Sequence, residues 1–185
     1  QSFVEDGFFI PDAKTGMSWK DIDNINIATN WGEGSVTQSG YPFIIKSLKR
    51  GQPLGQAKQI FAGEKTDVGV WPFSLKVGDD NLNMVVRSVT FFESLYFWLP
   101  DDKRQAIQLP IPEKVAVQGV FKGQLVLSLK QQWSPQGTEQ IFHSGDLVSF
   151  DLQYWLQNQE LRGLQLVYHP SKRATIDAVS ITKNA

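Results

Sequence analysis

Few residues in this 185-residue chain could carry out chemistry. There are no cysteines, and the only two histidines are His143 and His169. A thiol nucleophile, a disulfide and a thiolate metal site are therefore excluded, and two imidazoles are too few for a histidine-rich metal centre. Ser144 follows His143 directly, and two adjacent residues rarely have a geometry that suits proton transfer. We interpret His143–Asp146 as the polar tip of a hairpin.

Sequence motifs for hydrolysis, phosphate binding and calcium binding are incomplete. The chain has no Gly-x-Ser-x-Gly pentapeptide, of which Gly16–Lys20 matches only half. The segment Gly32–Ser35 is glycine-rich but lacks the lysine and the spacing of a phosphate-binding loop. Asp79–Asn81 and Asp101–Asp102 lack the register of a calcium loop, and such residues are typical of turns. The sequence thus predicts no catalytic residue, no metal site and no cofactor in this chain.

Charge and hydrophobicity argue against two classes of partner. Lysine and arginine number 18 and aspartate and glutamate number 19, a formal net charge of −1, whereas nucleic-acid-binding surfaces carry a basic excess. No run of about 18 apolar residues exists, and the longest one, Phe91–Leu99, is interrupted by Glu93 and Ser94. We therefore predict neither nucleic acid nor membrane as a partner. The absence of cysteine leaves the redox compartment undecided. Because the chain starts at Gln1 without a leader, we expect a processed or excised piece.

Short runs typical of β-strands dominate the chain, and four types of strand recur in a fixed order. The first type opens a unit, the second follows an Asp/Asn/Gly turn, the third is long and apolar, and the fourth is short. The opening strands are expected at 67–71, 114–118 and 174–178. The second type is expected at 25–29, 82–86 and 125–129, the third at 42–48, 95–99 and 147–154, and the fourth at 57–61, 105–109 and 164–167. Helical stripes are nearly absent, so the chain is predicted to be all-β.

The spacing of these units is typical of propeller blades. The opening strands at Val68, Val115 and Thr175 lie 47 and 60 residues apart, and the longer interval accommodates a hairpin extension at Gln131–Gly145. A four-stranded antiparallel unit of about 40–50 residues matches the blade of a β-propeller. We therefore predict a partial propeller of about three to four blades. The blades are expected at about 3–64, 65–112 and 113–173, with the first strand of a further blade at 174–185. A β-sandwich or an irregular barrel remains the alternative, because short strands at regular spacing are typical of these folds too.

Several segments together carry a family resemblance. They are Gly7–Lys14 with Ser18–Trp19, then Gly34–Pro42, Lys49–Leu54 and Arg87–Phe92. These segments resemble the non-catalytic region of bacterial prolyl oligopeptidase-family proteins, which are serine peptidases. The similarity covers roughly residues 7–110 and continues beyond them mainly in strand order. The compartment stays open between a bacterial cytoplasm and a periplasm.

The resemblance implies a propeller that caps an α/β-hydrolase domain and controls which short peptides reach its Ser-Asp-His triad. That catalytic domain, with its nucleophile, would lie outside this chain and be its partner in the same parent chain. This chain alone is therefore expected to be inactive. By position in the family pattern, Arg87 is a candidate for a residue near the substrate channel, and Val70 and Trp71 fall near another strand that faces it. The Thr and Phe residues after Arg87 depart from a polar loop, which leaves proline selectivity open.

Two other functions and one physical property follow from the same strands. The chain could be a non-enzymatic propeller scaffold that binds a partner, or a glycan-binding β domain in which pairs such as Trp19 and Trp31 stack on sugars. An interrupted propeller also has unpaired strand edges, which tend to pair with another chain. We therefore expect self-association through the terminal strands, or a last strand that folds back to complete the first blade.

Overall fold

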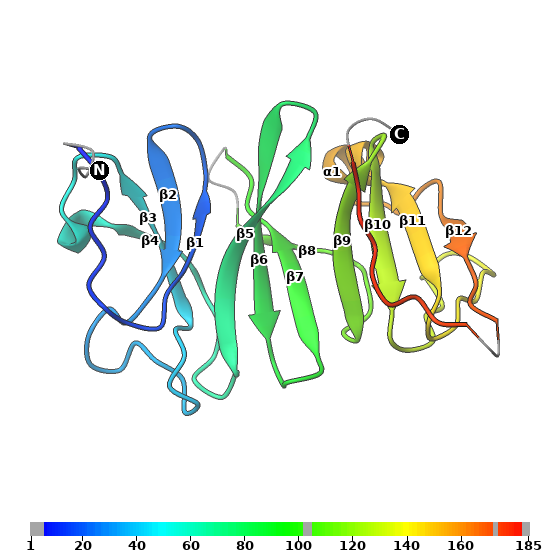
Figure 1. Ribbon diagram of the computed structural model, residues 1–185, viewed down its shortest axis with the longest axis horizontal. Helices are drawn as coiled ribbons and strands as arrows, with labels where there is room; N and C mark the ends of the chain where they lie inside the picture. Colours follow the sequence, from blue (N-terminus) through cyan, green and yellow to red (C-terminus); the bar gives the residue numbers. More distant parts are fainter. Residues whose placement is uncertain (1–5, 102–104, 172–173, 183–185) are drawn as a thin grey trace. The chain divides into compact units, whose positions relative to one another are not determined.

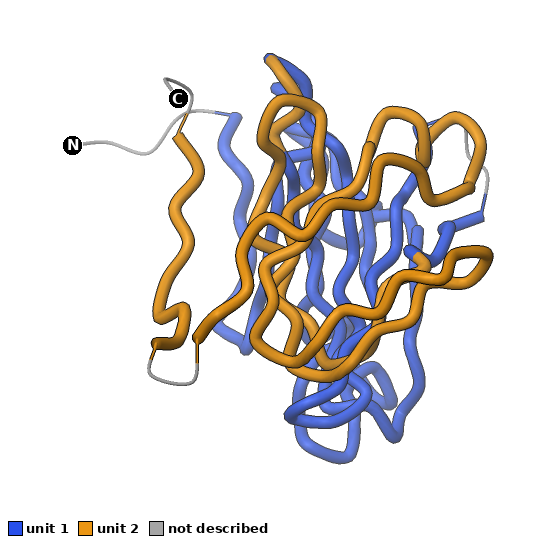
Figure 2. Tube along the Cα trace, turned by 90° about the vertical axis from the view of Figure 1, so that its right-hand side faces the viewer, with its two compact units in different colours: residues 1–75, 79–109 blue, residues 76–78, 110–185 orange. Residues whose placement is uncertain are grey.

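The computed structural model describes residues 6–101, 105–171 and 174–182. They form two compact units, one of residues 1–75 and 79–109 and the other of residues 76–78 and 110–185 (Figure 2). Each unit is built from antiparallel four-stranded sheets. No helix among the described residues has the length and apolar character needed to cross a membrane.

The first sheet has strands that follow one another in space as they do in sequence (Figure 1). Its strands are β1 (Gly16–Trp19), β2 (Asn24–Ala28), β3 (Ile44–Lys49) and β4 (Lys58–Ala62). A short 3-10 helix, η1 (Leu54–Gln56), precedes β4. The register of β2 pairs Asn26 with Ser18 on one side and with Ser47 on the other. No strand was predicted at 16–19, so this sheet is more complete than predicted.

The second sheet belongs to the same unit and has the same sequential order. It contains β5 (Gly69–Val77), β6 (Asp80–Ser88), β7 (Ser94–Trp98) and β8 (Ile107–Gln108). The turn between β6 and β7 is closed by backbone hydrogen bonds from the N–H groups of Val89 and Thr90 to the Glu93 carbonyl.

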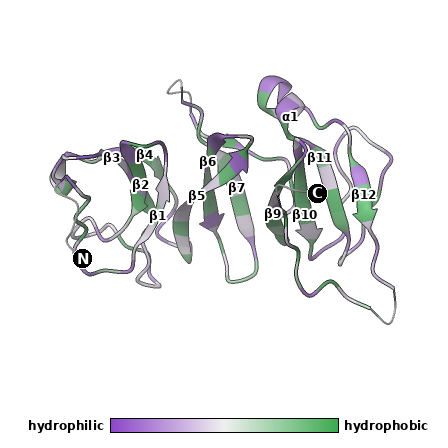
Figure 3. Cartoon of the chain, turned by 45° about the horizontal axis from the view of Figure 1, so that its top comes forward, coloured by the Kyte–Doolittle hydropathy of each residue, from purple (hydrophilic) through white to green (hydrophobic). Residues whose placement is uncertain are grey.

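The third sheet forms the second unit, again in sequential order. It contains β9 (Val115–Phe121), β10 (Gln124–Leu129), β11 (Leu147–Asp151) and β12 (Gln165–Tyr168). Between β10 and β11, Trp133 and Phe142 form an isolated antiparallel bridge within the segment predicted as a hairpin extension. The colouring in Figure 3 shows hydrophobic residues along β10 and β11; Leu125, Leu127 and Phe150 on these strands are fully buried.

The structure departs from two predicted strands in this unit. The strand expected at 147–154 ends at Asp151, where the helix α1 (Leu152–Asn158) begins. The carboxylate of Asp151 accepts the N–H of Tyr154 and caps the helix, and Leu152 and Trp155 are its buried residues. The strand expected at 174–185 is not formed over 174–182, which have no ladder, and 183–185 lie outside the described residues.

The first two sheets share an apolar core. One cluster contains Ala28, Phe43 and Ile45 from the first sheet and its approach, together with Val70 and Val85 from the second. The rings of Phe61 on β4 and Phe97 on β7 add a contact with centroids 5.0 Å apart. Because these side chains interdigitate from both sheets, the two sheets form one packed body, and a site at their junction has rigid walls.

Candidate functional site at the junction of the first two sheets

A buried ion pair lies where the chain passes from the first sheet to the second. On β6, Arg87 donates from Nε and Nη2 to the two carboxylate oxygens of Asp67, at 2.7 and 3.1 Å. The side chain of Asp67 is 1% exposed and that of Arg87 is 23% exposed. Asp67 also accepts the backbone N–H of Glu64 at 2.7 Å, which closes the turn before β5. The carboxylate therefore fixes both the turn and the direction of the guanidinium.

The electrostatics of this pair favour a permanent cation at Arg87. The hydrogen bond from Arg87 to Asp67 raises the pKa of the guanidinium above its ordinary value, against the lowering effect of burial. The negative charges of Asp67 and Glu64 add to the increase. A bidentate carboxylate uses two of the five N–H donors of an arginine, so the remaining donors of Arg87 are free to meet a carbonyl or carboxylate.

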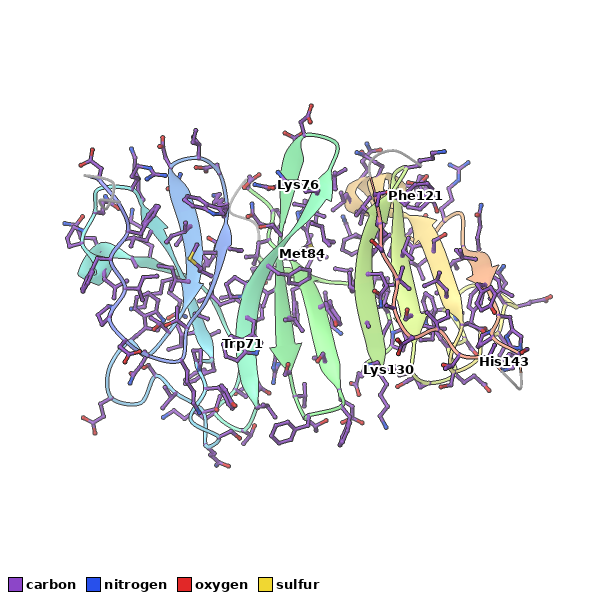
Figure 4. The ribbon with its side chains drawn as sticks, in the orientation of Figure 1. Trp71, Lys76, Met84, Phe121, Lys130 and His143 are labelled. Carbon is purple, nitrogen blue, oxygen red and sulfur yellow. The ribbon has the colours of Figure 1, made fainter. Side chains whose placement is uncertain are left out.

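The other two predicted channel residues have different surroundings. Val70 is fully buried in the core cluster with Val85, so its side chain has no surface that a ligand could touch in this structure. Trp71 lies on β5 (Figure 4) and is partly exposed. The ring of Trp71 packs edge-on against Tyr41, with centroids 5.7 Å apart, and a Cβ on Gly16 would lie 2.8 Å from it. No hydrogen bond or ring contact joins Arg87 to Trp71 within the described residues.

A cleft of about 480 Å³ lies between the first two sheets, away from these residues. Asn26 and Asn83, at 1% and 4% exposure, contribute to its lining, and the Nδ2 of Asn26 lies 3.5 Å from the Oδ1 of Asn83. The other described lining residues are Lys20, Ser47, Lys58, Gln59, Ile60, Leu99, Pro100, Asp101, Gln105 and Ala106. This cleft was not predicted from the sequence. A signal existed, because an asparagine between Ile25 and Ile27 in a buried strand departs from apolar patterning.

The two histidines form a cluster in the second unit. His169 bonds through Nδ1 to the carboxylate of Asp146 at 2.6 Å, and Asp146 also accepts the N–H of His143 at 2.7 Å. The imidazole rings are 6.2 Å apart, and Figure 4 shows His143 in the loop before β11. Among residues 6–101, 105–171 and 174–182, no three His, Cys, Asp or Glu side chains are grouped so as to hold a metal ion.

The two tryptophans considered for sugar stacking have separate structural contacts. Trp19 is 45% exposed and packs edge-on against Phe8, with centroids 5.8 Å apart. Trp31 donates from its indole N–H to the carbonyl of Ile44, and Lys46 lies over its ring. Trp31 is thus held in the fold of the first sheet by a hydrogen bond and a cation, and its ring is not an open stacking platform.

Comparison with known proteins gives one match in sequence and one in structure. The chain is 33% identical over 188 residues to an uncharacterized peptidase, y4nA, of Sinorhizobium fredii; the match covers 98% of this chain and 26% of that protein. It also matches the structure of a post-proline cleaving enzyme from Rickettsia typhi, with a TM-score of 0.75 and 20% identity over 85% of this chain. No protein-family model matches. The chain spans about a quarter of the length of each relative.

Proposed function

We propose that this chain, which is similar to a peptidase in sequence and to a post-proline cleaving enzyme in fold, controls the access of short peptides to a catalytic domain elsewhere in its parent protein. The predicted relationship to the prolyl oligopeptidase family is confirmed, and so is the fold, a partial propeller of four-stranded antiparallel blades. Access control is the function that these two findings support best.

The observation that carries this proposal is the sequential strand order in three successive sheets. Four-stranded sheets of this order are typical of β-propeller blades, and the strand edges and hairpin loops of such blades suit steric selection. They supply no nucleophile elbow, since the sequence lacks Gly-x-Ser-x-Gly, and no thiol, since it lacks cysteine. Hydrolysis of a peptide would therefore use groups from the rest of the parent protein. This chain would determine which peptides reach those groups.

Arg87 is our candidate for a group that meets the peptide. Its guanidinium is held by Asp67, is partly exposed, and carries a permanent charge with donors to spare. A cation in that position would bind a peptide carbonyl or carboxylate and would take no part in cleaving the peptide bond. Trp71 is the second candidate, because part of its ring is exposed; Val70 would act only through packing.

The proposal is tested with the parent protein and with this chain alone. We expect the parent to hydrolyse a chromogenic peptide with proline before the scissile bond, and the 185-residue chain to have no such activity. In the parent, Arg87→Lys should raise KM several-fold and leave kcat nearly unchanged, because it alters binding and not the reacting atoms. Hydrolysis by this chain alone that a serine reagent blocks would refute the proposal. A parent that cleaves folded proteins as fast as short peptides would refute it too.

The exposed strand edges carry our proposal for self-association. β12 is the last strand of its sheet, and all four of its residues are exposed, including Leu166, Val167 and Tyr168 at about half of their surface. An apolar edge strand with unpaired backbone groups is a template for pairing with another chain. In the intact parent, a neighbouring blade or the catalytic domain would cover such an edge.

A further inference from the structure

We propose that the cleft between the first two sheets, defined by Asn26 and Asn83, is a binding site for the carboxyl-terminal end of a short peptide. Both residues lie on the second strand of their sheets, within the matching segments Asn24–Ile27 and Asn81–Met84. The corresponding segment of the third sheet, Gln124–Leu127, has Val126 in place of the second asparagine. The fold therefore accepts an apolar residue there, and the amides serve something other than the strand.

The strongest evidence is an unpaired polar atom. The Oδ1 of Asn26 is buried and has no hydrogen-bond partner, and the same holds for the Oγ of Ser18, its cross-strand neighbour on β1. The single bond to Asn83, from Nδ2 at 3.5 Å, is at the limit of hydrogen bonding. A buried carbonyl without a donor is costly and is rare in native structures. A ligand in the cleft that carries an N–H or O–H group would satisfy it.

The charges around the cleft select an anion. Lys20 and Lys58 line it, and Asp101, the one acidic residue among the described lining residues, lies 3.6 Å from Lys20. No ion pair involves Lys58 within the described part of the chain, which leaves this amine for a ligand carboxylate. A donor N–H beside a carboxylate is the arrangement found at the last residue of a peptide that does not end in proline.

The shape and remaining lining fit the same ligand. A cleft of about 480 Å³ is in the range of small-molecule sites and takes a few residues at most. Ile60, Leu99 and Pro100 offer an apolar wall to a side chain, while Gln59 and Gln105 offer amides to a peptide backbone. No aromatic ring is among the described lining residues, so the site lacks the stacking surface that sugar binding commonly uses.

The choice of peptide as the ligand rests on the proposed function; the presence of an anion site does not. The test measures binding directly, without hydrolysis, so its failure is distinct from a failure of access control. The full chain, labelled with ¹⁵N, is titrated with N-acetyl-Gly-Ala and with its carboxamide. The side-chain amide signals of Asn26 and Asn83 are followed, and each is assigned by its absence in the spectrum of the corresponding variant.

We expect the free acid to shift both amide signals in a saturable way and the carboxamide to bind at least tenfold more weakly. Asn26→Val should reduce binding of the free acid at least tenfold and leave the melting temperature unchanged or raised, because it removes an unpaired buried carbonyl. Lys58→Gln should also weaken binding about tenfold. Lys49→Gln, an exposed lysine outside the cleft, is the matched control and should change nothing.

Three results would overturn the proposal. One is equal binding of acid and carboxamide, which would remove the role of the cations. Another is no saturable shift with either peptide, which would leave only water as the partner of Asn26. The third is a lower melting temperature for Asn26→Val together with unchanged binding by Lys58→Gln, which would make the asparagine a structural residue.

Discussion

Replacing Arg87 by methionine would leave the carboxylate of Asp67 buried without its cation. The side chain of Asp67 is 1% exposed, whereas that of Arg87 is 23% exposed. Methionine keeps much of the length and packing of the arginine stem, so the change isolates the charge and its two hydrogen bonds. The loss should therefore fall on the free energy of unfolding of the unit that contains both sheets.

The size of the expected loss in unfolding free energy follows from the burial of the ion pair. Removing one partner of a buried ion pair costs about 3–5 kcal/mol. Because Arg87 is partly in water and Asp67 keeps the N–H of Glu64, we expect about 2–4 kcal/mol. For a chain of this size that is a decrease of roughly 4–16 °C in melting temperature. Asp67→Asn should cost less, about 1–2 kcal/mol, because the charge left unpaired can reach solvent.

The assay is urea unfolding followed by tryptophan fluorescence, with the m value as a check that the unfolded state is unchanged. The double variant should be more stable than the sum of the single effects predicts, by about 1–3 kcal/mol. Arg162→Met is the control: Arg162 is exposed and lies over the ring of Tyr154, and its loss should cost about 1 kcal/mol or less.

The stabilisation that Arg87 contributes depends on pH in one direction. Because the pKa of Arg87 is raised in the folded protein, its stabilisation is fully present below the unfolded-state pKa. It is lost only as the pH rises through the folded-state pKa. The cost of Arg87→Met should thus be constant from about pH 6 to 10. A cost below about 1 kcal/mol, or a larger cost for Asp67→Asn, would refute the reasoning about the buried carboxylate.

Three further changes test other parts of the structure. Gly63→Ala should lower stability by about 1–3 kcal/mol, because its Cβ would lie 2.5 Å from Asp67 Oδ2; Gly55→Ala, with open space around it, is the control in thermal melts. Asp151→Ala removes the cap of α1 and should cost about 0.5–2 kcal/mol, whereas Asp151→Asn should retain most of it. Val167→Lys on the β12 edge should weaken self-association in sedimentation velocity; a wild-type chain that stays monomeric at all concentrations would contradict the edge proposal.

The repeat of strands could be predicted because each hairpin is marked by turn residues and each strand alternates or is continuously apolar. β1 was missed for a physical reason: its one buried residue is Ser18, while Met17 and Trp19 are nearly half exposed. That pattern is the reverse of the usual one, because Trp19 packs on Phe8 outside the sheet. A strand of four residues with a polar inner face gives no signal in hydrophobic periodicity.

The helix and the last strand were misassigned for opposite reasons. Leu152 and Trp155 have helical spacing and follow a capping aspartate, but seven residues are too few for a stripe to stand out against the strand before them. Residues 174–182 alternate as a strand does, yet a strand needs a neighbour to accept its hydrogen bonds, and no strand in the described part of the chain pairs with them. Periodicity indicates which side chains share a face, but it does not indicate which strand pairs with the segment.

The site was harder to predict because its contacts join distant residues. Asp67 and Asp146 each accept the N–H of the residue three positions earlier, at 2.7 Å. This half of each arrangement is local and typical of turns. The other half reaches a side chain 20 or 23 residues away, to Arg87 in one case and His169 in the other. The guanidinium of Arg87 makes two hydrogen bonds to its carboxylate, whereas His169 makes one and is more than half exposed. Only the first arrangement therefore holds a cation by two hydrogen bonds on a rigid support, which is why Arg87 is the channel candidate to test first.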